Sequence, residues 1–219
     1  GKSDKPETPY LVEDFAEDIR LVLDDLGIEK SAILGLSMGG FAALAFHRKY
    51  PERLTALMLG CTGPGLNDPR HVMFSKEIEE VLWSDRSEEQ LEATTRKYLN
   101  EFFHEDFRKE NPELMERLLK MAVENPQPAH AYTRQLEACY SAGPFSQTLE
   151  EIKVPVLIMH GNDDVITPVG NALFFAQHIN NAELFMHIFQ NAGHMFFVEK
   201  KMLFIRTVRD FLDRVFEEV

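Results

Sequence analysis

The segment from Ser31 to Gly60 constrains the fold more than any other part of the sequence. It contains a short apolar run, "SAILGL", then a glycine-rich turn, a helix of small residues in "GGFAALAFHRKY", a break at Pro51 and a second apolar run, "LTALMLG". Two strands joined by a helix in this order pair in parallel, with a right-handed crossover. The segment therefore predicts an α/β domain built on a mostly parallel sheet.

Apolar periodicity extends this architecture on both sides of the segment. Upstream, residues 11–26 carry apolar side chains at helical spacing, and Gly27 follows at the position of a helix C-terminal cap. Downstream, we predict a strand over residues 154–160, a helix over 171–179, a strand over 183–189 and a last helix from about Lys201.

Between these two α/β segments the pattern changes to one helix after another. Ser87 and Gln90 have the spacing of a capping box, and Asn111 followed by Pro112 predicts a second helix start. We therefore expect three regions in the chain. They are a first core segment with the glycine-rich turn (1–64), a helical lid (65–150) and a second core segment (151–219).

Composition excludes several classes of partner. A net charge of -13 argues against nucleic acid, because a phosphate backbone is bound by clustered Lys and Arg. No run approaches the roughly 18 consecutive apolar residues of a membrane helix, and "GKSDKPETPY" is no signal segment. We expect no membrane partner and a cytoplasmic protein. Cys61 and Cys139 have neither paired nor metal-like spacing, so we expect no disulfide framework and no metal site.

The turn "GLSMGG" is the first candidate for chemistry. A serine hydroxyl becomes a good nucleophile only when a base removes its proton, and a tight strand-to-helix turn lifts the side chain off the sheet edge. Gly35, Ser37 and Gly39 occupy the Gly-x-Ser-x-Gly positions. The N–H of Met38, at a helix N-terminus, is placed to face an oxyanion forming beside Ser37. The alternative is a glycine turn without a catalytic role.

Partners for such a serine occur near the C-terminus. "VPVLIMHGNDDVITP" places Asp163 and Asp164 in the loop after a buried strand, and we expect Asp164 to orient an imidazole and Asp163 to be structural. Asp68 is an outside candidate for the same acid. His194, in "FQNAGHMFF", lies in the loop after the last predicted strand and follows a glycine. No HExxH or paired histidine spacing indicates a metal site.

Apolar residues near these loops suggest the kind of substrate. We expect a pocket lined by Phe41, Trp83, Met195 and Phe196, and a small to medium apolar ester or lactone. The competing interpretation is that such residues form ordinary packing faces. Arg134 is a candidate partner for a substrate carboxylate, although an arginine on a helix is more often at the surface. The chemistry needs no cofactor.

Taken together, "GLSMGG", "HGNDDVITP" and "NAGHMFFVE" resemble the motifs of the α/β-hydrolase fold superfamily. The resemblance implies a Ser-Asp-His triad in this chain order, with the acid four residues before a proline, as Asp164 is before Pro168. "GLSMGG" and "YTRQLEA" are similar to the enol-lactonase and methylesterase branch. Carbon–carbon bond hydrolysis, acyl transfer, perhydrolysis and an impaired, hydrolase-like binding or regulatory protein all remain open.

The sequence departs from the superfamily in one respect. Members normally have further strands upstream of the segment that "GKSDKP" resembles, and an earlier loop supplies the second oxyanion donor; nothing here matches that segment. We expect the N-terminal part of the sheet to be missing and the second donor to have no counterpart. An open sheet edge would follow, and such edges promote self-association, so we expect a homo-oligomer.

Overall fold

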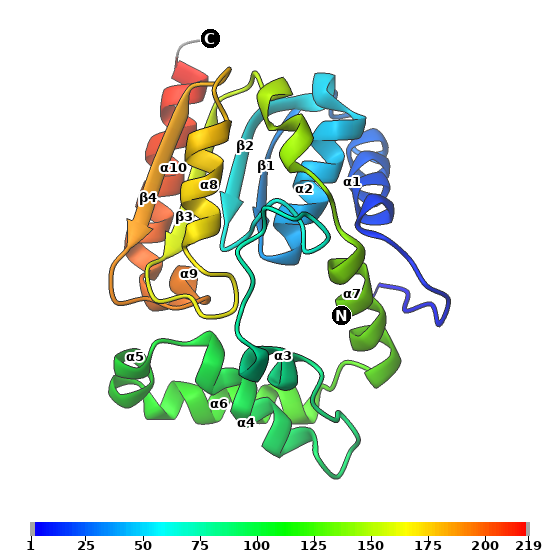
Figure 1. Cartoon of the computed structure of the whole chain (residues 1–219), viewed down its shortest axis with the longest axis vertical. Coiled ribbons are helices and arrows are strands. Elements are labelled where there is room, and N and C mark those ends of the chain that lie inside the picture. The colour runs from blue at the N-terminus through cyan, green and yellow to red at the C-terminus, as the bar shows by residue number, and fades with distance from the viewer. Residues whose placement is uncertain (1–2, 218–219) are drawn as a thin grey trace.

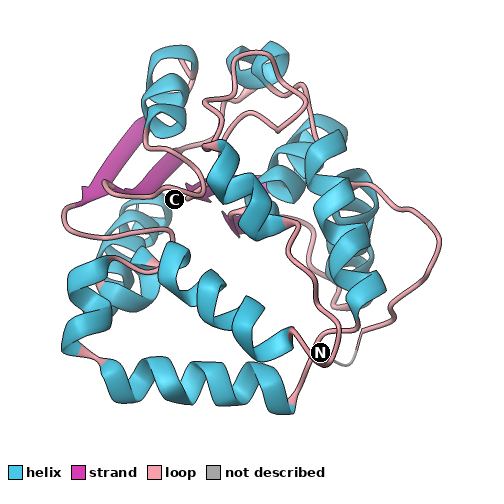
Figure 2. Ribbon diagram, turned by 60° about the horizontal axis from the view of Figure 1, so that its bottom comes forward, coloured by secondary structure: helices cyan, strands magenta, loops and turns pink. Residues whose placement is uncertain are grey.

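The computed structural model describes residues 3–217 as a parallel sheet with helices on both faces and a further layer of helices at one end (Figures 1 and 2). The described sheet has four strands in the order β1-β2-β3-β4, and every neighbouring pair is parallel. The strands are β1 (Ser31–Leu36), β2 (Leu54–Gly60), β3 (Val156–Gly161) and β4 (Leu184–Phe189). The predicted fold class is confirmed. The bounds of β1 and β2 match the predicted ones, and those of β3 and β4 differ by at most two residues.

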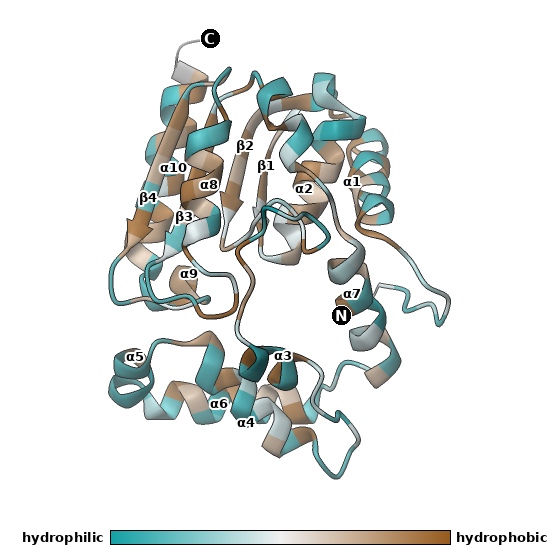
Figure 3. Ribbon diagram, viewed as in Figure 1, coloured by the Kyte–Doolittle hydropathy of each residue, from teal (hydrophilic) through white to brown (hydrophobic). Residues whose placement is uncertain are grey.

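Helices cover both faces because the central strands are apolar on both faces. Leu57 and Ile158 belong to one core, which packs beneath α1 (Val12–Asp25), α2 (Met38–Lys49) and α8 (Gly170–His178). Met58 and Leu157 point the other way, into a second core that includes Phe211 of α10 (Lys201–Glu217). Successive strand side chains alternate between faces, so a continuous apolar strand serves both cores. Figure 3 shows the resulting hydrophobic interior.

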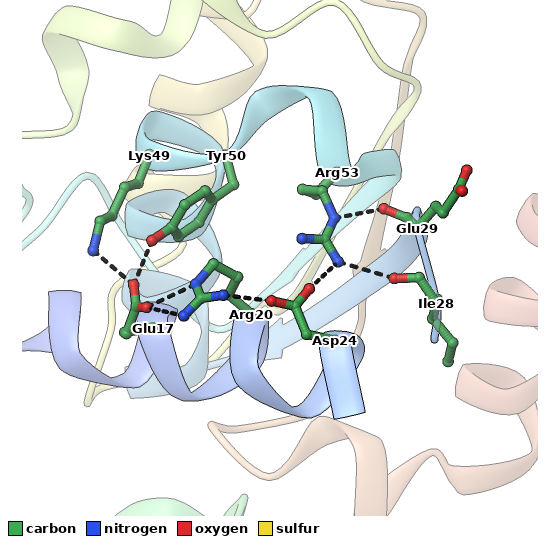
Figure 4. A network of polar contacts seen from close by, with 8 residues as sticks. All are labelled: Glu17, Arg20, Asp24, Ile28, Glu29, Lys49, Tyr50 and Arg53. Atoms are coloured by element: carbon green, nitrogen blue, oxygen red, sulfur yellow. Dashed lines mark hydrogen bonds and ion pairs between the residues drawn. The ribbon is translucent and has the colours of Figure 1, made fainter. Parts of the chain in front are cut away.

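Helix α1 is fastened to the end of α2 by a surface network (Figure 4). Glu17 accepts hydrogen bonds from Arg20, Lys49 and Tyr50, and these bonds lower the pKa of Glu17 to about 2. Gly27, just past α1, has φ +65°, as the predicted cap requires. Exposed ion pairs contribute little stability, so this network mainly sets how the two helices align.

The predicted lid is helical and lies beyond the carboxyl ends of the strands (Figure 1). Ser87 does not begin a helix there as predicted. Its N–H and hydroxyl donate instead to Asp85, and the next helix has Gln90 as its N-cap. The prediction at Asn111 and Pro112 is confirmed, with Pro112 in the first turn of a helix. The helices of the lid region are α3 (Lys76–Leu82), α4 (Leu91–Phe102), α5 (Glu105–Glu110), α6 (Pro112–Glu124) and α7 (Ala129–Ser141). The 3-10 helix η2 (Ser146–Glu151) lies instead at the opposite end of the sheet (Figure 1), and its Leu149 belongs to the first core.

The two connections of the lid to the sheet domain are joined to each other. The N–H of Asn67 donates to the carbonyl oxygen of Ala142 (3.0 Å). Both carboxylate oxygens of Asp68 accept backbone hydrogen bonds, from Arg70 (2.9 Å) and from Ser146 (2.8 Å). Asp68 therefore holds the lid connections together, which accounts for its burial without a role at the histidine.

The remaining described elements are two short helices, η1 (Pro51–Arg53) and α9 (Phe196–Glu199). Within residues 3–217, no helix combines the length and apolar character needed to cross a membrane.

Candidate active site

Ser37 lies in a strained turn between β1 and α2. Its φ and ψ are 53° and -122°, a conformation that side chains other than glycine rarely adopt. Two hydrogen bonds hold the turn: the Ser37 N–H donates to Gly60 (2.9 Å), and the Ser37 carbonyl oxygen accepts from the Gly40 N–H (2.8 Å). Strain of this kind persists where the surrounding structure imposes it, and it is typical of functional sites.

Close packing explains two of the three glycines around Ser37. A Cβ added at Gly35 would lie 2.3 Å from the carbonyl oxygen of Gly39, and one at Gly40 would lie 2.5 Å from Thr62 Oγ1. A Cβ added at Gly39 would meet no atom within 4 Å. The turn therefore depends sterically on Gly35 and Gly40, whereas Gly39, which completes the sequence motif, is not required for space.

Asp164 and His194 form a buried hydrogen-bonded pair. His194 Nδ1 lies 2.9 Å from Asp164 Oδ2, and the two residues are only 2% and 4% exposed. Since an ionised carboxylate only accepts hydrogen bonds, Nδ1 carries the imidazole proton, and Nε2 of the neutral ring is left with a free lone pair. The pair joins the loop after β3 to the loop after β4, as the sequence predicted.

A second histidine supports the same carboxylate, and the sequence analysis missed it. His160, on β3, has Nε2 2.6 Å from the carbonyl oxygen of Thr167 and 3.3 Å from Asp164 Oδ2. The other oxygen of Asp164 accepts from the N–H groups of Ile166 (2.9 Å) and Thr167 (2.8 Å). Burial by itself raises the pKa of Asp164, but His194 and His160 outweigh it and lower that pKa to about 2. The carboxylate is therefore ionised at neutral pH.

Asp163, the neighbouring acid, is placed differently. Its N–H donates to Ala192 (3.0 Å), and its half-exposed carboxylate lies 3.6 Å from Nε2 of His104 in the lid. The two adjacent aspartates are therefore placed differently: Asp164 is hydrogen-bonded to His194, and Asp163 contacts the loop of Ala192 and the lid.

Sheet topology brings Ser37 to the same edge as this pair. The turns after β1, β3 and β4 carry Ser37, Asp164 and His194, respectively. The strands of the sheet run parallel, so their carboxyl ends lie along the same edge. Cys61, directly after β2, is fully buried. Burial raises the pKa of its thiol well above the usual value, and the charge of Asp164 raises that pKa further. A hydrogen bond with the Ser37 backbone opposes the shift. The buried Cys61 side chain therefore neighbours both Ser37 and Asp164.

Met38 begins α2 directly after Ser37. The first N–H groups of a helix have no acceptor within the helix, and the helix dipole adds positive potential there. The backbone N–H of Met38 is therefore available to an oxyanion at Ser37.

The lid closes over the histidine loop through specific contacts. The ring of Phe102, at the end of α4, meets the His194 ring edge to face with centroids 5.1 Å apart. The N–H of Met195 donates to the Phe102 carbonyl oxygen (3.0 Å). Glu199 Oε1 accepts from the N–H of His104 in the lid (3.1 Å) and from that of Gly193 (3.3 Å). These contacts explain why His194 is almost completely buried. Phe102 was noticed in the sequence only as one of many lid aromatics.

The residues expected to line a pocket lie in different environments. Phe41 is buried in the core shared with α1 and packs edge to face on His71. Phe196 is fully buried in the second core and stacks on Phe189. Met195 is half-buried beside His194, whereas Trp83 is 45% exposed on the lid, with its indole N–H donating to Tyr140 (3.2 Å).

Arg134 also lies away from the triad candidates. It donates to the carbonyl oxygen of Glu7 (2.7 Å) and pairs with Glu137 (2.6 Å). Both cysteines are free thiols, and residues 3–217 contain no cluster of three or more side chains suited to a metal ion.

Comparison with known proteins places these motifs in context. A model of the alpha/beta hydrolase fold family matches residues 1–201. A curated relative from Burkholderia vietnamiensis, a 2-hydroxy-6-oxononadienedioate/2-hydroxy-6-oxononatrienedioate hydrolase, is 34% identical over 88% of this chain and 66% of its own length. 3-Oxoadipate enol-lactonase 2 from Acinetobacter baylyi is 27% identical over 98% of this chain and 75% of its own length. The chain thus spans about two thirds of the first relative.

Solved structures agree on the fold. Est816, described as an N-acyl homoserine lactone degrading enzyme, superposes with a TM-score of 0.75 at 25% identity, over 96% of this chain and 78% of its own. The enol-lactonase from Burkholderia xenovorans has a TM-score of 0.78 at 24% identity, over 97% of this chain and 76% of its own. This second likeness shows the fold alone.

Proposed function

Because the chain belongs to the α/β-hydrolase superfamily, we propose that it is a serine hydrolase in which Ser37, His194 and Asp164 form the catalytic triad and Met38 supplies an oxyanion donor. The observation that carries the proposal is the buried His194–Asp164 hydrogen bond of 2.9 Å at the sheet edge where Ser37 occupies a strained turn. A structural histidine would not need an ionised carboxylate on one nitrogen and a free lone pair on the other.

The proposed reaction follows from these positions. His194 Nε2 takes the proton of the Ser37 hydroxyl as Oγ bonds to the substrate carbonyl carbon, and the Met38 N–H stabilises the oxyanion. His194 then gives that proton to the leaving group as the bond to it breaks, leaving an acyl-enzyme. Water, deprotonated by His194, releases the acid and restores Ser37. Asp164 stays ionised and holds the histidine tautomer throughout.

We propose a small to medium apolar carboxylic ester or lactone as the substrate. The lactonase names of the Acinetobacter baylyi relative and of Est816 support this class. The Phe102 ring on His194 supports an apolar surface above the reacting atoms. Of the residues expected to line the pocket, half-buried Met195, next to His194, is the best placed, and Trp83 remains a candidate on the lid. Phe41 and Phe196 are packed inside the two cores and would support the pocket from behind.

A second candidate reaction is carbon–carbon bond hydrolysis with the same triad. The Burkholderia vietnamiensis relative is named for a 2-hydroxy-6-oxo dioate, a compound with a ketone and no ester, so its hydrolysis must break a carbon–carbon bond. Assaying a 2-hydroxy-6-oxo dienoate beside an ester of similar length separates the two reactions by their relative kcat/KM.

The first prediction tests the nucleophile. A fluorophosphonate probe should label the folded protein, and Ser37→Ala and His194→Ala should each abolish labelling and ester turnover while circular dichroism shows an intact fold. Asp164→Ala should reduce turnover by orders of magnitude more than Asp163→Ala. Folded protein that is never labelled would favour a hydrolase-like binding protein, and a larger effect at Asp163 would contradict the assignment of the acid.

A further inference from the structure

Arg86 occupies an unusual environment in the lid. Its guanidinium carbon lies 3.6 Å from the ring centroid of Tyr132 and 4.5 Å from that of Tyr98, so two aromatic faces hold the cation. Both tyrosine hydroxyls donate to the same carbonyl oxygen, that of Leu82, at 2.8 Å and 3.2 Å. The shared acceptor fixes both rings, and the rings in turn fix the guanidinium.

The backbone that carries Arg86 is also held firmly. Asp85 accepts hydrogen bonds from the N–H and hydroxyl of Ser87 through its carboxylate, and from the Thr94 hydroxyl (2.6 Å) through its carbonyl oxygen. The connection between α3 and α4 is therefore ordered on both sides of Arg86. An arginine needed only for solubility requires no such support.

Within residues 3–217 the Arg86 guanidinium lacks a carboxylate partner. Its Nε is buried and donates no hydrogen bond to the described residues, and none of their ion pairs includes the guanidinium. By contrast, Arg96 pairs with Glu92 and Glu116, and Arg134 with Glu137. A partly buried cation without an anion is costly, and its planar fork of donors matches a carboxylate.

This cation lies close to the proposed reaction site. Tyr98 stacks on Phe102 with centroids 5.0 Å apart, and Phe102 contacts the His194 ring. Two aromatic rings thus separate Arg86 from the proposed base. Both rings pack against an apolar cluster that joins Leu82 of the lid to Ile166 of the Asp164 loop, so Arg86 borders the apolar layer between lid and catalytic loops.

We propose that Arg86 is a specificity-determining residue that binds a carboxylate at the far end of the substrate from the scissile bond. The inference rests on the proposed function and sharpens it: the preferred substrate has an apolar chain that crosses the Phe102 and Tyr98 rings and ends in an anion. Apolar contacts hold the chain, and the guanidinium selects the charged end.

The test uses two p-nitrophenyl esters of equal chain length, the monoester of adipic acid, with a free carboxylate, and the hexanoate, which is neutral. The full chain should turn over the adipate monoester with the higher kcat/KM. Arg86→Met should lower that value roughly 10- to 100-fold, through KM, with little effect on the hexanoate. Arg86→Lys should recover part of the loss, because it keeps the charge without the fork. Arg134→Met, also in the lid, should leave the ratio unchanged.

Binding measured on a Ser37→Ala background separates this inference from the triad proposal. Calorimetric titration should show that Arg86→Met weakens binding of the adipate monoester but not of the hexanoate, whether or not the wild-type chain hydrolyses either ester. Equal weakening for both esters, or no change for either, in Arg86→Met and Arg86→Lys would overturn the role of Arg86 and leave the serine hydrolase standing. Selective loss of binding without any turnover or fluorophosphonate labelling would support Arg86 while the triad proposal fails.

Discussion

Asp164 shows how much of the site depends on one side chain. Its carboxylate accepts from two backbone N–H groups and from His194, and His160 lies 3.3 Å from the same oxygen as His194. These donors compensate for the loss of water around a buried charge, which is otherwise costly. Removing the carboxylate would therefore disturb stability as well as the histidine tautomer.

We predict that Asp164 contributes stability at neutral pH that is lost in acid. Its pKa in the folded state is about 2, below the usual 3.8. Because the pKa of Asp164 is lower in the folded state than in the unfolded state, its carboxylate stabilises the fold at any pH above the unfolded-state pKa. This contribution is lost as the pH falls through the folded-state pKa. Asp164→Asn should lower the free energy of unfolding by roughly 2 kcal/mol at pH 7 and by about half of that at pH 3. Urea unfolding at both pH values measures this, with Asp163→Asn as control; a pH-independent difference would contradict it.

Glu199 is the residue through which the lid and the histidine loop share a hydrogen-bonding partner. Oε1 accepts from the N–H of His104, and the N–H of Gly193 is shared between Oε1 (3.3 Å) and Oε2 (3.1 Å). An amide oxygen in the place of Oε1 would therefore preserve a hydrogen bond to each N–H. We predict that Glu199→Ala lowers kcat about 10-fold and increases hydrogen exchange at residues 193–195. Glu199→Gln should stay close to wild type in both measurements. Equal losses for the two variants would show that charge, and not the bridging oxygen, is what matters.

At the scale of elements, the strand-to-helix turn at Ser37 depends on glycines whose added Cβ would collide with neighbouring atoms. Gly35 faces the backbone of Gly39, and Gly40 faces Thr62, so β1, α2 and the loop after β2 approach closely at this point. The sequence motif treats Gly35 and Gly39 as equivalent. Only the packing around the turn distinguishes them.

We predict that alanine substitutions in this turn separate accordingly. Gly35→Ala should destabilise the protein by roughly 1–3 kcal/mol, because backbone atoms cannot move aside for the added methyl group. Gly39→Ala should change stability by less than about 0.5 kcal/mol, since its added Cβ meets open space. Thermal denaturation of the two variants measures the difference. A similar loss at both positions would mean that the turn needs glycine for reasons other than space.

On the scale of the whole molecule, the described sheet has β1 at one edge, paired on one side by β2. Helix α1 exposes Leu21 and Val22, its C-cap Leu26 is also exposed, and β1 itself exposes Leu34 to 38%. An unpaired strand edge beside exposed apolar side chains is a template for self-association.

We therefore predict that the 219-residue chain self-associates through this edge. Light scattering coupled to size-exclusion chromatography should give a mass above that of the monomer. Leu34→Lys should shift the mass toward the monomer, because a charge on an edge strand opposes pairing. Met202→Lys, on α10 with 75% of its surface already exposed, is the matched control and should have no effect. A monomer at every concentration would contradict the prediction.

Local patterns determined much of this protein. Periodicity and the glycine turn predicted the parallel sheet, the bounds of its strands to within one or two residues and the helical lid, because these features depend on neighbouring residues. Ser37, Asp164 and His194 could be chosen from the sequence because each follows a strand, and parallel strands end at one sheet edge. The Ser87 capping box failed because Asp85 competes for the same hydroxyl.

Only the tertiary structure decided how distant segments meet. Three features depend on contacts between residues far apart in the chain: Phe102 covers His194, Glu199 bridges two loops, and the ring of Tyr132 lies against Arg86. The contact of His160 with Asp164 spans only four residues, but it depends on how the loop after β3 folds back on the strand. Sequence spacing places a residue on an element and a face. Which side chain it then touches depends on how lid and sheet pack together, and that packing sets the proposed specificity.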